Sequence, residues 1–318
     1  MPKRYRRSDL HEHILAVMDE MSEDDPFEAV RKKAQAVVAQ YASAFEEVPP
    51  FNVTAVASMR GLHWSNDDPR FSPDSEIAPE ADGRVVLRVN KNRPATRQRF
   101  SICHEIGHTL FPEYQLAVRC RKGANRSFAD ATDLIETLCD AAASELMFPV
   151  PWFSGRIATM IITAASVAEL ASDYQASRDA TARRLVELHP EPLAAVFLSW
   201  KFKPTEIRAA KRHSAERLLF SDMTPETPKP LLRVDYAITN AQFENQFADH
   251  IPKDKSVANE GPIYLASITQ TLQDGVADLN LGTLQGQFNI SALPIFTSAD
   301  ALGPNDASSV VAILTAVG

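Results

Sequence analysis

The sequence predicts an α+β fold: a mostly helical first half with a small β-sheet, a short helix-turn-helix-like segment, and a C-terminal α+β domain rich in strands. Two observations lead to this prediction. Apolar residues recur at helical spacing before residue 190, whereas after it β-branched and apolar residues gather in short runs between turns. The chain of 318 residues is also long enough for two or three domains.

The N-terminal region is expected to begin with helices over residues 9–46, followed by a short helix over Val53–Gly61. The apolar positions that carry the helical period in the first stretch are Ile14, Val17, Met18, Val30, Ala34, Val37 and Val38. The stretch Ser65–Gly83 is polar and contains prolines, so it is expected to be a loop. Arg84–Asn90 is rich in valine and is expected to form a strand.

Two longer helices are predicted after this strand. The first is expected over Arg97–Phe111, with Thr96 as its N-cap and Pro112 ending it, because proline lacks the N–H that a continuing helix needs. The second is expected over Ala131–Met147, and Pro149 ends it in the same way.

The remaining elements complete three expected domains. Ser166–Leu188 is predicted to form two short helices around a turn at Gln175–Ser177. Five strands are expected beyond it, over Leu193–Phe202, Pro230–Thr239, Pro262–Thr269, Gly286–Phe296 and Ser308–Val317. We therefore expect domains over residues 1–155, 156–190 and 191–318.

Charge and cysteine content limit the classes of function. The net charge of -8 argues against nonspecific nucleic-acid binding over the whole surface. The sequence contains no run of about 18 apolar residues and its first residues do not form a secretory signal, so we expect a cytoplasmic protein without a membrane partner. Its cysteines, Cys103, Cys120 and Cys139, are odd in number and are expected to be reduced thiols, with a redox role as the alternative.

The segment RFSICHEIGHTLF, Arg99–Phe111, carries a metal-ligand motif. His104 and His108 are four residues apart, so on a helix both imidazoles lie within about 40° and face the same way. Two neutral imidazoles suit zinc, and Glu105 is a natural general base for a zinc-bound water. Gly107 costs about 1 kcal/mol inside a helix, which indicates that another backbone approaches closely. The alternative is that both histidines are ordinary helix residues.

A catalytic zinc needs a third protein ligand, and the second long helix supplies several carboxylates. Glu136 and Asp140 are four residues apart and share a face, whereas Glu145 lies about 180° round the helix from Glu136. Glu136 is long enough to reach the metal, and Asp140 could accept the ring N–H of a liganding histidine. Asp133 is the alternative ligand.

These motifs resemble the thermolysin-like glutamate zincins and, more closely, the ImmA/IrrE family of bacterial metallopeptidases. The resemblance rests on RQRFSICHEIGHTLF (Arg97–Phe111), on the strand before it, and on IETLCDAAASELMFP (Ile135–Pro149). The family typically shows RxRF-x-x-A-HE-x-GH and then E-x-x-AN-x-FA-x-x-LLMP. Here Cys103 replaces an alanine, Cys139-Asp140 replaces Ala-Asn and Ala142 replaces a phenylalanine, and these changes leave every proposed ligand in place.

The resemblance covers about residues 30–190 and implies a zincin-like domain with zinc-dependent endopeptidase activity. His104, His108 and Glu136 would hold Zn²⁺, and Glu105 would be the catalytic base that passes a proton to the leaving amine.

Substrate contacts are less defined by the motifs. The strand Val85–Val89 is expected to pair with an extended substrate by β-addition. Tyr114 and His63 are the candidates for stabilising the oxyanion, with a structural role as the alternative for both. Other substrate-binding residues are unassigned.

The expectations for the rest of the chain also follow from the family. In IrrE-like proteins a helix-turn-helix follows the peptidase-like domain, and Ser166–Leu188 has the spacing of apolar and small residues that is typical of that motif. If it reads DNA, Arg178, Arg183 and Arg184 are the expected contacts, and the alternative is a structural or docking role. Residues 193–318 occupy the place of a GAF-like sensory domain.

The resulting hypothesis is a regulatory metallopeptidase that cleaves a protein substrate, a helix-turn-helix transcriptional repressor, in a stress, DNA-damage or mobile-element response. DNA or single-stranded DNA is a candidate activator. One alternative is a non-catalytic zinc-containing regulatory protein whose fourth ligand is Cys120 or His63. Another is the peptidase component of a toxin–antitoxin or phage-defence system.

Overall fold

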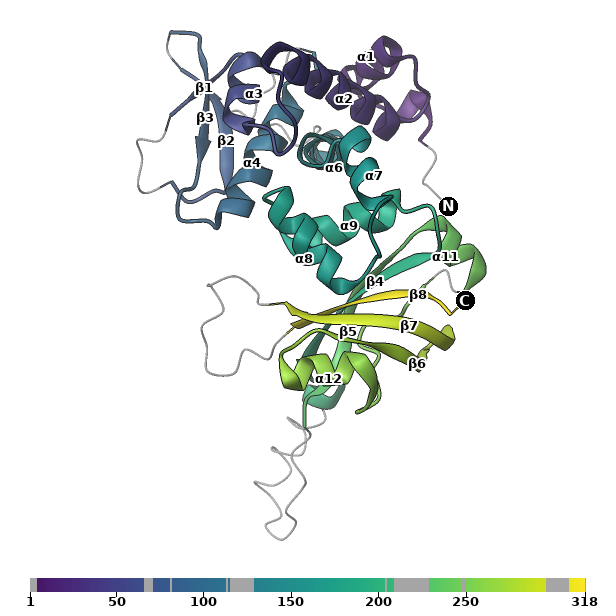
Figure 1. Ribbon diagram of the computed structural model, residues 1–318. Helices are drawn as coiled ribbons and strands as arrows, with labels where there is room; N and C mark the ends of the chain where they lie inside the picture. The colour runs from purple at the N-terminus through teal and green to yellow at the C-terminus, as the bar shows by residue number, and fades with distance from the viewer. Residues whose placement is uncertain are drawn as a thin grey trace, which may run out of the picture. The chain divides into compact units, whose positions relative to one another are not determined.

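In the part of the chain that the computed structural model describes, the strands form two β-sheets, one of three strands and one of five (Figure 1). The structure describes residues 5–65, 71–80, 82–112, 114, 129–203, 205–208, 229–247, 250–295 and 309–317, with the backbone alone over 129–133. The chain divides into unit 1, which is Met1–Ala158 with Leu170–Ala180, and unit 2, which is Thr159–Glu169 with Thr181–Gly318. The predicted α+β class is confirmed.

Unit 1 begins with the 3-10 turn η1 (Arg7–Asp9) and the helices α1 (Glu12–Met21), α2 (Pro26–Phe45) and α3 (Val53–Met59). The apolar residues predicted to carry the helical period of α1 and α2 are buried. Asp25 caps α2, because its Oδ1 accepts hydrogen bonds from the backbone N–H of Phe27 at 2.8 Å and of Glu28 at 3.1 Å.

The sheet of unit 1 contains β1 (Leu62–Trp64), β2 (Ser75–Pro79) and β3 (Val85–Val89) in the order β1-β3-β2. β1 runs parallel to β3, and β2 runs antiparallel to it. The predicted strand is confirmed as β3, but the predicted loop over Ser65–Gly83 is wrong where β2 forms. β2 is an edge strand that buries only Ile77 and Ala78, so its sequence is too polar to show a strand pattern.

The helices α4 (Ala95–His108), α6 (Ala129–Met147) and α7 (Val150–Ile157) complete the first part of unit 1. α6 packs against both α4 and α2. The predicted N-cap is wrong: Pro94 is the N-cap of α4, and Thr96 lies inside the helix. The helix also ends at His108 rather than Phe111, where the Thr109 hydroxyl donates to the Ile106 carbonyl at 2.7 Å.

The two helices predicted over Ser166–Leu188 are confirmed as α8 (Ala164–Asp173) and α9 (Arg178–Leu188). The turn between them contains Gln175 in the left-handed region, at φ 52°. At the start of α9 the Ser177 hydroxyl oxygen accepts a hydrogen bond from the backbone N–H of Ala180 at 3.1 Å.

Unit 2 contains a fully antiparallel sheet in the order β5-β4-β8-β7-β6. Its strands are β4 (Leu193–Lys201), β5 (Leu231–Thr239), β6 (Gln273–Leu281), β7 (Leu284–Ile295) and β8 (Ser309–Ala316). The helices α11 (Ala241–Gln246) and α12 (Gly261–Thr269) complete the unit, and α12 packs on β6, β7 and β8 (Figure 1).

Four of the five strands predicted for this unit are confirmed as β4, β5, β7 and β8, but the strand predicted over Pro262–Thr269 is wrong, because this segment is α12. Pro262 lies in the first turn, and the buried residues Ile263, Ala266 and Ser267 follow the helical period. Among the described helices, none has both the length and the hydropathy to cross a membrane.

Candidate metal centre

The close approach of two helices in unit 1 builds the site. A Cβ atom placed on Gly107 of α4 would lie 3.0 Å from the Cα and 3.1 Å from the carbonyl oxygen of Cys139 on α6. Because real Cβ atoms are rarely found so close to another backbone, only glycine lets α4 and α6 pack at this distance. The expectation that a second backbone approaches Gly107 is confirmed.

This packing brings together the three residues predicted to hold a metal. His104 and His108 face the same way, with ring centroids 5.0 Å apart. Oε2 of Glu136 on α6 lies 3.0 Å from Nε2 of His104 and 3.6 Å from Nε2 of His108. Ligand atoms about 2.0–2.2 Å from a tetrahedral zinc lie roughly 3.3–3.5 Å from one another. The donor set therefore fits a divalent metal ion of this size.

Each histidine is held by its other ring nitrogen. Nδ1 of His104 lies 2.8 Å from Oδ1 of Asp140, the arrangement expected from the sequence. Nδ1 of His108 lies 3.3 Å from Sγ of Cys139, and both residues are buried. This second contact was not predicted, although Cys139 lies three residues after Glu136 and next to Asp140. Such outer contacts fix the tautomer and the orientation of a liganding imidazole.

The charges around His104 favour a cation at the site. Burial lowers the pKa of His104, but its hydrogen bonds with Asp140 and Glu136 outweigh this effect and raise the pKa to about 9. Carboxylates on both sides of one imidazole thus create a region of negative potential, which either a proton or a metal ion can neutralise.

Glu105 lies beside the three candidate ligands with its carboxylate buried. Its Oε1 accepts a hydrogen bond from the hydroxyl of Ser75 on β2 at 2.7 Å. Its Oε2 is buried and has no hydrogen-bond partner within the described structure. A buried carboxylate oxygen without a partner is costly unless it serves a ligand or a reaction. Ser75 was not predicted as a site residue because its segment was expected to be a loop.

These groups line a cleft of about 560 Å³ between β2, α4 and α6. The start of β2 forms one wall. Asp74, the residue before β2, accepts hydrogen bonds from Arg97 of α4 and from Arg93 just before α4, both at 2.7 Å. The prediction that Val85–Val89 pairs with a substrate is wrong, because β3 is the central strand and has a neighbour on each side. The strand at the cleft is β2, which pairs only with β3 among the described strands.

Several candidates from the sequence do not join the site. Glu145 is buried away from the cleft, and its Oε2 accepts a hydrogen bond from Gln35 at 3.1 Å, as its position on the helix predicted. Tyr114 approaches the carbonyl of Arg60 at 3.5 Å, and His63 is exposed on β1, so neither lines the cleft. The side chain of Asp133 and all of Cys120 lie outside the described residues.

Two of the three arginines expected to read DNA have other contacts in the structure, and the half-buried Arg178 leaves that prediction untested. Arg184 is only 1% exposed and donates to Glu187 at 2.9 Å, so it cannot reach a DNA groove. The guanidinium of Arg183 lies 4.9 Å from the ring centroid of Tyr236. Burial and stacking of these two side chains assign them to the packing of unit 2.

Comparison with known proteins agrees with this geometry. Residues 56–186 match the family of IrrE N-terminal-like domains. The chain is 24% identical over 262 residues to the radiation response metalloprotease IrrE of Deinococcus radiodurans, which covers 78% of this chain and 71% of the relative. A solved structure of a Mycobacterium tuberculosis transcriptional regulator shares the fold, with a TM-score of 0.51, 12% identity, and coverage of 92% of this chain and 82% of that chain.

The matched residues include the whole of α4 and α6, and therefore every side chain that the crossing of these two helices brings together. The His-His-Glu donor set, the match of residues 56–186 to IrrE N-terminal-like domains and the similarity to a metalloprotease over most of the chain support the resemblance to the ImmA/IrrE family.

Proposed function

We propose that this protein is a zinc-dependent endopeptidase that cleaves a regulatory protein. The observation that carries the proposal is the state of Glu105, whose Oε2 is buried in the cleft wall without a hydrogen-bond partner among the described residues. A carboxylate that served only to stabilise the fold would be paired at both oxygens. Such an oxygen beside a metal-ligand set is suited to accept a proton from an attacking water.

The residues of the cleft have different roles in this proposal. His104, His108 and Glu136 would hold the ion, and Asp140 and Cys139 keep the two imidazoles oriented. A bound zinc supplies Lewis acidity, which lowers the pKa of a coordinated water to about 7.

Glu105 has the proton-transfer role in this proposal. Its Oε2 takes a proton from the attacking water and delivers it to the leaving amine, while Ser75 holds Oε1 in place. The free edge of β2 offers backbone N–H and C=O groups to an extended substrate, beginning at Ser75. Substrate would therefore lie along β2 rather than β3.

The similarity to a radiation response metalloprotease is the reason to place the substrate in gene regulation. We propose a helix-turn-helix transcriptional repressor as the substrate class, in a stress, DNA-damage or mobile-element response. In this proposal residues 1–155 form the peptidase domain, 156–190 a structural or docking segment, and 191–318 a regulatory domain.

The test uses Glu105→Gln, which keeps the size of the side chain and removes its basicity. Cleavage of candidate repressors encoded near this gene should fall by about 10²–10⁴-fold, the usual contribution of a general base. Zinc content should stay at the wild-type level, because Glu105 is not a ligand. Glu28→Gln, an exposed change on α2, is the matched control. If Glu105→Gln cleaved the substrate as fast as the wild type, Glu105 would not be the general base.

The non-catalytic alternative requires a closed metal site with a fourth protein ligand. Within the described residues no fourth donor joins His104, His108 and Glu136. Cobalt substitution separates the two functions, because a sulfur ligand or the absence of an exchangeable water would favour the structural site. A role in toxin–antitoxin or phage-defence systems would use the same chemistry and differ only in the substrate.

A further inference from the structure

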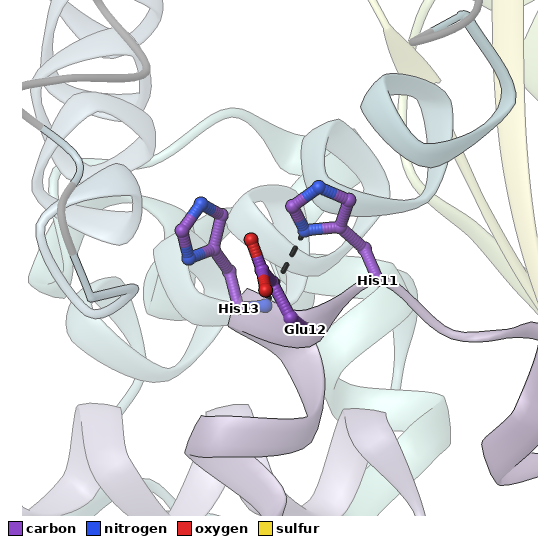
Figure 2. Close-up of side chains that lie close together, drawn as sticks. All are labelled: His11, Glu12 and His13. Atoms are coloured by element: carbon purple, nitrogen blue, oxygen red, sulfur yellow. Dashed lines mark hydrogen bonds between the residues drawn. The ribbon is translucent and has the colours of Figure 1, made fainter.

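A second group of metal-binding side chains lies at the start of α1. His11, Glu12 and His13 are consecutive in the sequence, and one donor atom from each lies within 4.8 Å of the other two. Figure 2 shows the two imidazole rings on the same side of the first helical turn, with the Glu12 carboxylate between them. The ring centroids are 4.7 Å apart. None of these residues lines the cleft of the candidate metal centre.

We propose that His11, Glu12 and His13 bind a divalent transition-metal ion, independently of the peptidase site. Two imidazoles and one carboxylate suit the later first-row ions, with copper bound more tightly than nickel or zinc. Three protein ligands leave further coordination positions open to water, so the site would exchange its metal readily.

The backbone holds one imidazole in position before a metal arrives. His11 is the N-cap of α1, and its Nδ1 accepts a hydrogen bond from the backbone N–H of His13 at 3.3 Å. This contact holds the His11 ring over the first turn.

Small side-chain rotations would complete the coordination. Ligand atoms around zinc lie roughly 3.3–3.5 Å apart. The donor atoms of the three side chains lie within 4.8 Å of one another, so they would have to approach by at most about 1.5 Å. Glu12 is exposed and His13 is half-buried, so these two side chains have room to rotate toward the His11 ring.

The position of the site at a helix N-terminus works against a cation. The helix dipole there costs a cation a few-fold in affinity. Glu12 offsets this cost because its carboxylate is a ligand and a negative charge at the same place. The site should therefore be weaker than the one between α4 and α6, whose ligands are more buried and already oriented.

The experiment is a calorimetric titration of the untagged full chain with Zn²⁺ alone. The wild type should show two classes of site, one tight and one weaker. In His11→Asn/His13→Ala the weaker class should lose more than about tenfold in affinity, the lower bound for losing even an outer partner of a metal site. Asparagine at position 11 preserves the N-cap acceptor, so the helix start should remain intact. His63→Ala, which changes an exposed histidine on β1, is the matched control.

The tight class and peptidase activity should be unchanged in the double variant, which separates this proposal from the proposed function. A single class in the wild type, or a weaker class that survives the double variant, would overturn the proposal. His13→Ala alone leaves the cap contact of His11 with the backbone in place. If this variant binds the weaker equivalent as tightly as the wild type, the proposal is also overturned.

Discussion

Replacing Gly107 with alanine tests whether the crossing of α4 and α6 builds the metal centre. Alanine raises intrinsic helix stability by about 1 kcal/mol relative to glycine. Its Cβ, however, would lie 3.0 Å and 3.1 Å from backbone atoms of Cys139, which cannot rotate away as the end of a side chain can. Overpacking of this kind costs about 1–3 kcal/mol, and contact with a backbone places the cost near the upper end.

The free energy of unfolding should therefore fall by about 1–2 kcal/mol, which lowers Tm by roughly 2–8 °C for a domain of this size. Zinc affinity should fall as well, because the displaced α6 carries Glu136 away from His104 and His108. Urea denaturation followed by circular dichroism measures the first effect, and calorimetric titration with Zn²⁺ measures the second.

The matched control is Gly155→Ala in α7. This glycine is also helical, but no heavy atom of the described structure would lie within 4 Å of a methyl group at this position. The control should gain up to about 1 kcal/mol in the free energy of unfolding and bind zinc normally. If Gly107→Ala were as stable as Gly155→Ala and bound zinc equally well, the close helix crossing would not be what sets the ligand geometry.

Two further variants test the contacts around the site. Cys139→Ala removes the acceptor for Nδ1 of His108 and should weaken zinc binding by about 10–100-fold. Cys139→Ser should restore most of the zinc affinity. Equal affinity in the wild type and both variants would exclude a positioning role for Cys139. Asp74→Asn should destabilise the fold at pH 7 by at most about 1 kcal/mol, because its ion pair with Arg97 is partly screened by solvent. Hydrogen bonding to Arg97 lowers the pKa of Asp74 in the folded protein. The difference in free energy of unfolding between wild type and Asp74→Asn should therefore be fully present above the pKa that Asp74 has in the unfolded chain, and vanish as pH falls through its lower pKa in the folded protein. A difference that does not change with pH in urea titrations would contradict this reasoning.

The relative placement of the candidate ligands could be predicted from the sequence because it depends on the period of single helices. The spacing of His104 and His108 places both on one face of α4, and the same argument separates Glu136 and Asp140 from Glu145. The distance between α4 and α6 depends on tertiary packing, but Gly107 inside the helix indicated that another backbone approaches closely. Helix periodicity and one glycine were thus enough to predict which side chains of α4 and α6 lie close together.

The contacts from β2 could not be predicted in the same way. Ser75 reaches Glu105 only because β2 pairs with β3 and is fixed by Asp74, and a short polar edge strand carries no pattern that distinguishes it from a loop. The strand expected over Pro262–Thr269 failed for a related reason. Its composition favours a strand, but packing of Ile263 and Ala266 on the large sheet stabilises a helix.

The two imidazoles of the site are oriented by different physical means. His104 is partly exposed, and the carboxylate of Asp140 that holds it is 58% exposed, so its orientation depends on a charged hydrogen bond in contact with solvent. His108 is 5% exposed and is held by burial and by a thiol, which is a weak acceptor. High salt should therefore weaken the contact of His104 first, whereas a change in packing between α4 and α6 should displace His108 first. This difference explains why a cysteine at position 139 is compatible with a metal site. Because packing already fixes the His108 ring, the weak thiol acceptor of Cys139 is enough to set the tautomer of His108.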